Sequence, residues 1–149
     1  MKIKNQLFNE CKLYVEKRER TIREIMTSNK KALLSETKSS AGDKHETGRA
    51  MLQLEMEKAS QQIAVVQQMK EILHRINPDD VSEVIRLGSL VHTNSATYYL
   101  SISIGAVAVD NDMYFVISSS SPIGKLLIGK KVNDIIQFNG QQIKITEVN

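Results

Sequence analysis

Two carboxylates three residues apart, Asp43 and Glu46, are the residues whose types and spacing most suggest chemistry. Residues three apart on a helix lie on the same side, so the two side chains can act together. Mg²⁺ prefers oxygen ligands and keeps several waters, so one or two carboxylates help to hold it without enclosing it. An Asp followed three residues later by a Glu also suits the cap of a helix. The spacing alone leaves both interpretations open.

The histidines and the single cysteine give weaker signals. His45 lies between the two carboxylates, where a lone histidine is commonly just solvated. His74 and His92 have no cysteine or carboxylate partners at the spacing of a zinc site, so we expect no structural zinc. Cys11 cannot form an intramolecular disulfide and falls on an apolar stripe, so we expect it to be buried in a protein of a reducing compartment.

The composition excludes several classes of protein. A chain of 149 residues with 41% hydrophobic and 25% charged residues is ordinary globular material, enough for one domain or two small ones. The net charge of +3 is too small to identify a partner. The sequence has no apolar run of the kind found in signal peptides or membrane spans. We therefore expect a cytoplasmic protein without a membrane partner.

The two halves of the sequence differ in charge and in chain-breaking residues. Residues 1–76 contain 15 Lys and Arg against 10 Asp and Glu, whereas residues 77–149 contain 5 against 7. The second half also holds both prolines and five of the seven glycines. This change predicts a helical arm over 1–76, a linker over 77–87 and a second domain over 88–149.

Two long amphipathic helices are predicted in the first half. From Asn5 to about Lys38 the apolar residues recur at steps of three and four, and a second series from Leu52 to Ile76 does the same. The first series comprises Leu7, Cys11, Tyr14, Ile22, Ile25 and Ala32. The polar stretch 38–44 suits a tight connection. The result is an antiparallel two-helix coiled-coil hairpin with its tip near 39–48.

The second half has the pattern of short strands. Four runs rich in β-branched and aromatic residues predict strands at 97–104, 113–119, 134–138 and 142–148. Asn111 lies between the first two runs and Asn139-Gly140 between the last two, where each suits a turn with positive φ. We expect antiparallel pairing at both turns.

One short helix is predicted within this β-rich half. Ser121 suits the N-cap, Pro122 the first helical position, and Gly129 the C-cap. The expected fold class is therefore α+β: an N-terminal helical hairpin followed by a small antiparallel β domain with one short helix.

The segment Ile117–Asp134, ISSSSPIGKLLIGKKVND, resembles the FKBP-like C-terminal domain of the Gre transcription factors, where a strand leads into an SPxGxALxGKxxGD-like helix and loop. The positions in register are Ser121, Pro122, Lys125, Leu127, Gly129, Lys130 and Asp134. The final run 142–148 resembles the closing strand of that domain. In Gre factors a coiled-coil hairpin precedes it, with a G-D-x-x-E-N-A-E-Y motif at the tip, and Gly42–Glu46 matches the first five positions. The resemblance thus covers essentially the whole chain.

The sequence departs from the Gre pattern directly after Glu46. It continues Thr47-Gly48-Arg49-Ala50 where the pattern has N-A-E-Y, so that Arg49 replaces an acidic residue. Asn133 also replaces the usual glycine before Asp134. The first departure makes cleavage activity less secure than binding to polymerase.

The resemblance implies a protein that assists another enzyme. The hairpin would enter the secondary channel of bacterial RNA polymerase, where Asp43 and Glu46 would help to hold a second Mg²⁺ that activates water for cleavage of backtracked RNA. The protein would have no cofactor of its own, would act as a monomer, and would meet the RNA 3′ end only indirectly. Docking would involve Ser121, Pro122 and Lys125. Prolyl isomerase activity is not expected.

Two other functions fit the same sequence. The altered residues after Glu46 suit a non-cleaving regulator of the secondary channel, DksA-like or similar to inhibitory Gre-like proteins. A coiled-coil scaffold pairing between chains is a third class, but Arg18, Asn29 and Lys70 interrupt the apolar stripes and argue against it.

Basic residues crowd the first helix: Lys12, Lys17, Arg18, Arg20, Arg23, Lys30 and Lys31. They suit electrostatic steering towards RNA or an acidic channel. A solvated face balanced by neighbouring glutamates is the simpler interpretation.

Overall fold

The computed structural model describes residues 2–38 and 42–149, with the side chains of residues 36–45 left out of the description. Contacts divide the chain into two compact units. The hairpin unit is Val15–Lys70, and the sheet unit combines Met1–Tyr14 with Glu71–Asn149. Two long helices, α1 (Lys2–Lys38) and α2 (Gly42–His74), each contribute to both units.

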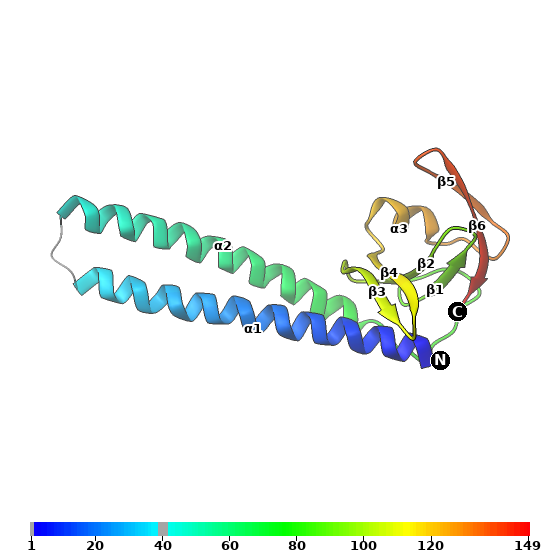
Figure 1. Cartoon of the computed structure of the whole chain (residues 1–149), viewed down its shortest axis with the longest axis horizontal. Helices are drawn as coiled ribbons and strands as arrows, with labels where there is room; N and C mark the ends of the chain where they lie inside the picture. The colour runs from blue at the N-terminus through cyan, green and yellow to red at the C-terminus, as the bar shows by residue number, and fades with distance from the viewer. Residues whose placement is uncertain (1, 39–41) are drawn as a thin grey trace. The chain divides into compact units, whose positions relative to one another are not determined.

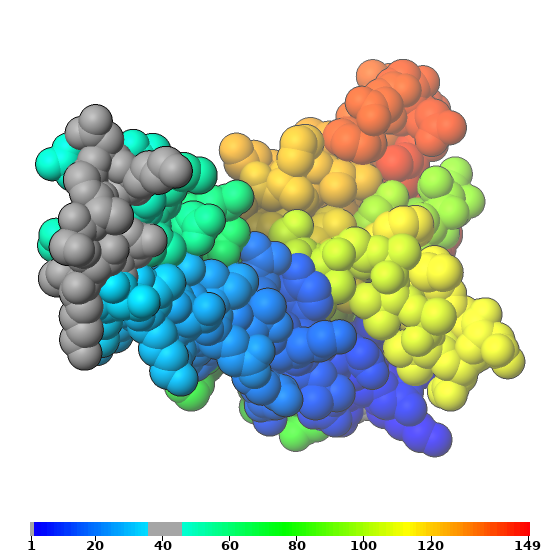
Figure 2. Space-filling model, turned by 60° about the vertical axis from the view of Figure 1, so that its left-hand side comes forward, coloured from blue at the N-terminus to red at the C-terminus, as the bar shows by residue number. Residues whose placement is uncertain are grey.

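In the hairpin unit α1 and α2 lie side by side and run antiparallel (Figure 1), and the space-filling view shows α2 against α1 (Figure 2). Glu19 of α1 forms an ion pair with Lys70 of α2. The buried residues follow each helix at steps of seven: Val15, Ile22 and Asn29 on α1, and Ala59 and Val66 on α2. A seven-residue repeat is the seam of a coiled coil, so the predicted hairpin is confirmed.

The seam differs in detail from the predicted stripe. Ile25 is 44% exposed, whereas Val15, which the first series omitted, is 2% exposed. Alternating steps of four and three lead from Ile22 to the half-buried Met26 and on to Asn29, so Ile25 falls beside the seam. Both helices also start earlier than predicted, and α2 already includes Gly42.

The sheet unit contains a six-stranded sheet in the order β3-β4-β2-β1-β6-β5. The strands are β1 (Leu90–Thr93), β2 (Thr97–Ser101), β3 (Gly105–Val109), β4 (Asp112–Ser118), β5 (Ile135–Phe138) and β6 (Gln141–Val148). One short helix, α3 (Pro122–Leu127), follows β4. All neighbouring strands pair antiparallel except β2 and β4. The α+β class with a leading hairpin and one short helix is confirmed.

The sheet corrects one predicted pairing. The runs 97–104 and 113–119 were expected to pair antiparallel, but β2 and β4 pair in parallel, with Tyr98 opposite Phe115. The turn at Asn111 instead joins β4 to β3, a strand that its small residues concealed in the sequence. Asn139 and Gly140 have φ of 52° and 77° in the turn between β5 and β6, as predicted.

The core of the sheet unit is apolar. Its central cluster comprises Ile85, Val91, Leu100, Ile123, Leu127, Ile136, Ile143 and Ile145. α3 begins where expected, because Ser121 is its N-cap and Pro122 its first residue. The C-cap is Ile128, one position before the predicted Gly129, and Gly129 follows it with φ of 84°. Gly124 allows α3 to lie close to β4, since an added Cβ would be 2.2 Å from the carbonyl oxygen of Ser118.

The first turns of α1 belong to the sheet unit and bury Leu7 and Cys11 completely. Cys11 Sγ lies 3.4 Å from the hydroxyl oxygen of Ser101 at the end of β2. Burial raises the pKa of the Cys11 thiol to about 11, so the thiol stays protonated and unreactive at neutral pH. The predicted burial of Cys11 is confirmed.

Candidate functional site

The predicted carboxylates, Asp43 and Glu46, lie in the first turns of α2, in the hairpin unit. Asp43 is the second residue of α2, so it lies inside the helix and not at the N-cap position. The side chains of Asp43 and His45 lie outside the described residues. Glu46 is exposed. At 1.5 Å per residue, Glu46 is about 36 Å along α2 from Lys70. Since residues 42–46 are helical, Asp43 and Glu46 keep the spacing that places them on the same side of α2.

The departures from the Gre pattern continue along the same helix. Arg49 is exposed and lies three residues after Glu46, so its positive charge is close to that carboxylate on the helix surface. Gly48 lies inside the second turn of α2, where glycine costs about 1 kcal/mol relative to alanine. The start of α2 is therefore less negative and intrinsically less stable than a tip with the full motif.

Several basic residues of α1 are exposed in the hairpin unit: Lys17, Arg20, Arg23, Lys30 and Lys31. Arg23 and Lys30 of α1 line a hollow together with Met56 of α2. Glu19 lies beside this surface, but its ion pairs with Lys70 and Arg23 compensate its charge. The hydrogen bond from Lys70 is the main cause that lowers the pKa of Glu19. Glu19 is thus held by one basic residue from each helix of the hairpin unit.

The three residues expected to dock on a partner are not equally available. The Ser121 hydroxyl donates to the Ser118 carbonyl oxygen at 2.6 Å and accepts from the Gly124 backbone N–H at 3.1 Å. This hydroxyl is therefore committed to the helix cap. Pro122 and Lys125 are exposed on α3 and remain open to a partner.

Apolar side chains beside α3 are also exposed. Leu126, Ile128 and Ile135 are 38%, 39% and 57% exposed, and α3 contacts β5, the strand that carries Ile135. Asn133 has φ of 78°, a left-handed conformation that asparagine tolerates better than most residues. An asparagine at position 133 is thus compatible with the conformation of this loop.

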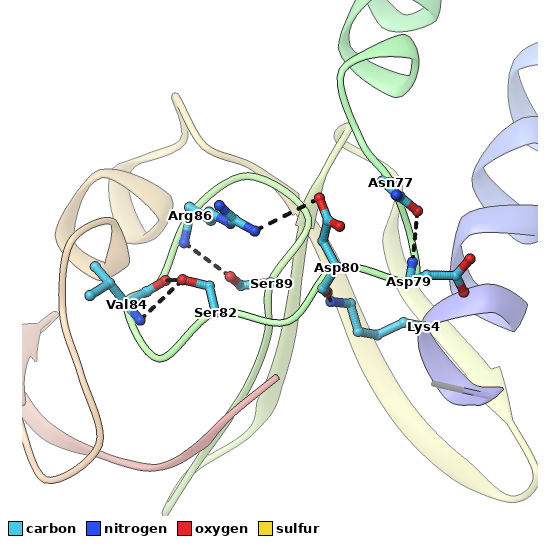
Figure 3. Close-up of polar contacts among 8 residues, drawn as sticks. All are labelled: Lys4, Asn77, Asp79, Asp80, Ser82, Val84, Arg86 and Ser89. Carbon is cyan, nitrogen blue, oxygen red and sulfur yellow. Dashed lines mark hydrogen bonds and ion pairs between the residues drawn. The ribbon is translucent and has the colours of Figure 1, made fainter.

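A polar pocket, which we call the Lys4 pocket, lies in the sheet unit and was not predicted. It has a volume of about 250 Å³ between the first turn of α1 and the loop 75–89. Figure 3 shows how Lys4 reaches the backbone oxygen of Asp80, with Nζ to O at 2.5 Å, while the Asp80 carboxylate faces Arg86. Arg75 also lines the pocket.

The Lys4 ammonium is poor in negative partners. Lys4 is 2% exposed, and burial lowers its pKa, with the positive charge of Arg86 the next cause. Asp80 and Asp79 act in the opposite direction. The Asp80 carboxylate is 3.8 Å from Arg86, a long ion pair between side chains that are both more than half exposed.

The floor of the Lys4 pocket is shaped by Gly88 and Ser89. Gly88 has φ of 90°, and an added Cβ would lie 3.1 Å from the side chain of the buried Ile76. The Ser89 hydroxyl accepts a hydrogen bond from the Arg86 backbone N–H at 3.0 Å, which holds the loop in its turn. Local spacing in the sequence gives no sign of this pocket, because Lys4 is more than seventy residues away from the loop.

Neither a metal centre nor a membrane segment is found in the described part of the chain. No three side chains among His, Cys, Asp and Glu gather there in the arrangement of a metal site. Within the same residues no helix has an apolar stretch that could cross a bilayer. Comparison of the sequence with protein-family models gives no match, and comparison with curated proteins gives none.

Proposed function

We propose that this protein is a transcription elongation factor of the Gre type. It binds bacterial RNA polymerase through the secondary channel with its hairpin and stimulates the polymerase's own cleavage of backtracked RNA. The observation that carries the proposal is the order of elements: an antiparallel helical hairpin, an acidic pair at the start of α2, then an α+β domain whose capped α3 matches the Gre-like segment. The protein acts as a monomer and is not an enzyme alone.

The proposed mechanism uses the carboxylates of Asp43 and Glu46. Both belong to the helical start of α2, with Glu46 exposed to solvent. In the polymerase they help to hold a second Mg²⁺, which they cannot enclose alone. When bound, that ion would supply activation of a water for hydrolysis of the phosphodiester. Their contribution is therefore made only in the complex.

Two exposed surfaces, one in each unit, support binding. The exposed basic face of α1 favours approach to an acidic channel or to RNA phosphates. In the sheet unit, Pro122 and Lys125, with the exposed apolar residues Leu126 and Ile135, suit docking on the rim of a large partner. Ser121 contributes by capping α3.

Transcript cleavage in a purified polymerase complex stalled on backtracked RNA tests the proposal. The wild-type protein should shorten the RNA, and Asp43→Ala with Glu46→Ala should remove the stimulation while still binding polymerase. Glu55→Ala with Glu57→Ala is the matched control, because it removes two exposed carboxylates from α2 farther from its start. Equal stimulation by both double variants would contradict the assigned role of the acidic pair.

A second candidate function is a non-cleaving regulator of the same channel. Arg49 favours it, because this exposed positive charge near Glu46 opposes the delivery of a metal ion. A regulator binds polymerase and competes with a cleavage factor but leaves backtracked RNA intact. If Arg49→Glu creates cleavage that the wild-type protein lacks, the second candidate holds. Absence of binding to polymerase would overturn both.

A further inference from the structure

We propose that the Lys4 pocket binds the phosphate groups of a small ligand, with inorganic pyrophosphate as the simplest example. The pocket belongs to the sheet unit, whereas the residues assigned to cleavage belong to the hairpin unit, and the inference is independent of the proposed function. Four charged side chains line the pocket: Lys4, Arg75, Arg86 and Asp80. Three positive charges against one negative leave it with a net charge of +2.

The donors that face this space are those that phosphate recognition requires. Among the described residues Lys4 Nζ donates to the backbone oxygen of Asp80, which leaves two of its three protons for a ligand. Arg75 has no ion pair in the described part of the chain, and Arg86 has only the long contact to Asp80. Guanidinium groups offer forked donors to phosphate oxygens, and lysine adds a point charge.

The volume and lining of the pocket restrict the ligand. Pockets for drug-sized molecules hold 300 Å³ or more and are mostly apolar. At about 250 Å³, with Lys4, Ser82 and Ser89 among its lining residues, this pocket is smaller and more polar. It therefore suits a compact anion, and any organic part of the ligand would extend outwards past the exposed Arg75 and Arg86.

Burial makes Lys4 the selective element of the site. A lysine that is 2% exposed has lost most of its hydration, and the nearby Arg86 raises the cost of its charge further. An anion with two or more negative charges compensates both groups at once. The Asp80 carboxylate competes with the ligand for Arg86. It does not bind Lys4, which donates to the Asp80 backbone oxygen.

Isothermal titration of the full chain with inorganic pyrophosphate tests the proposal. Arg86→Gln should weaken binding roughly tenfold, since it removes a charge-assisted donor. Asp80→Asn should tighten binding several-fold, because it removes the competing charge and leaves the backbone oxygen in place. Arg23→Gln is the matched control: Arg23 is 56% exposed, as Arg86 is, and also pairs with a carboxylate. It should bind like the wild type.

The outcomes separate a built site from general charge attraction. Equal weakening by Arg23→Gln and Arg86→Gln, or weaker binding in Asp80→Asn, would overturn the proposal, as would no binding of pyrophosphate. A nucleoside diphosphate that competes with pyrophosphate would support a nucleotide as the source of the phosphates. Binding of single-stranded RNA that depends on Arg86, without binding of pyrophosphate, would instead assign the pocket to nucleic acid. Circular dichroism checks that each variant is folded.

Discussion

The sheet unit and the hairpin unit bury apolar residues in different arrangements. In the sheet unit, side chains from four strands, α3 and the loop before β1 meet in one cluster, so each residue is held from several sides. In the hairpin unit, buried residues follow a line along two helices at steps of seven, and each meets one facing helix. The stability of the sheet unit therefore depends on one cluster of mutually packed side chains. The stability of the hairpin unit depends on many smaller contacts repeated along the two helices.

Buried polar residues occur in both units, but those of the sheet unit, Lys4, Ser89 and Ser101, lie outside its central cluster. Asn29 lies on the seam of the hairpin unit, 7% exposed, and its Nδ2 has no hydrogen-bond partner among the described residues. The central cluster of the sheet unit consists of aliphatic residues. A buried asparagine costs stability and fixes the register of paired helices. Asn29 thus lowers the stability of the hairpin unit but favours one alignment of α1 with α2.

The largest predicted difference compares the same substitution in the two units. Ile145→Ala should destabilise the sheet unit by about 4 kcal/mol, and Ile22→Ala the hairpin unit by about 2 kcal/mol, because an open seam relaxes around a cavity more easily. The two side chains are 0% and 4% exposed. All four tyrosines lie in the sheet unit. Tyrosine fluorescence therefore follows that unit in urea, while circular dichroism follows the helices.

Equal losses in the two variants would remove the distinction between a clustered core and a linear seam. Ile22→Val serves as the conservative control and should cost about 1 kcal/mol.

Asn29→Leu should stabilise the hairpin unit by about 2 kcal/mol, since it removes a buried amide donor without a partner and adds apolar contact. The helical signal should resist higher urea, and the tyrosine signal of the sheet unit should change little. Sedimentation should show whether the variant remains a monomer, because the asparagine also opposes other pairings of the helices. A loss of stability would mean that Asn29 has a partner in solution.

Ser121→Ala should cost the sheet unit about 1 kcal/mol through loss of the cap of α3. Ser121→Asp should recover most of this loss, because aspartate also accepts a hydrogen bond from the Gly124 backbone N–H. The urea midpoint from tyrosine fluorescence measures both. An equal loss in the two variants would show that the hydroxyl acts mainly as donor to the Ser118 carbonyl.

The smallest effect is expected for Lys70→Gln, which breaks the ion pair with Glu19. The pKa of Glu19 lies below its ordinary value of 4.5, so the pair stabilises the hairpin at neutral pH and this gain is lost as the pH falls below 4.5. The wild type and variant should therefore differ slightly at pH 7 and converge on acidification. Lys58→Gln, which changes an exposed lysine of α2, is the control. A difference that persists in acid would exclude Glu19 as its cause.

Sequence patterns predicted the features that depend on local chemistry. The three-residue and four-residue steps along residues 5–38 predicted the first helix of the hairpin, and Ser121 and Pro122 predicted the start of α3. The Asn139-Gly140 turn was also predictable, because few other pairs adopt positive φ twice. In each case the signal lies within a few residues.

The features that were missed depend on contacts between distant residues. The parallel pairing of Tyr98 with Phe115 requires a crossover connection, which no turn motif predicts. Strand β3 was missed because its residues are small and their burial is only partial. The Lys4 pocket joins the first turn of α1 to the Asp80 loop. For the acidic pair, the sequence predicted the spacing of Asp43 and Glu46 on a helix, while their role in polymerase remains a prediction.

Gly88 limits how the Lys4 pocket can be altered. Its φ of 90° strains any residue with a side chain, and an added Cβ would press on Ile76 at 3.1 Å, so a substitution at Gly88 disturbs the packing of the sheet unit. A change in ligand preference is therefore best sought at Arg75 and Arg86, which are exposed and can be replaced at little cost to folding, whereas Lys4 is buried. An engineered version that accepts a sulfonate or a carboxylate should accordingly be sought by varying these two positions alone.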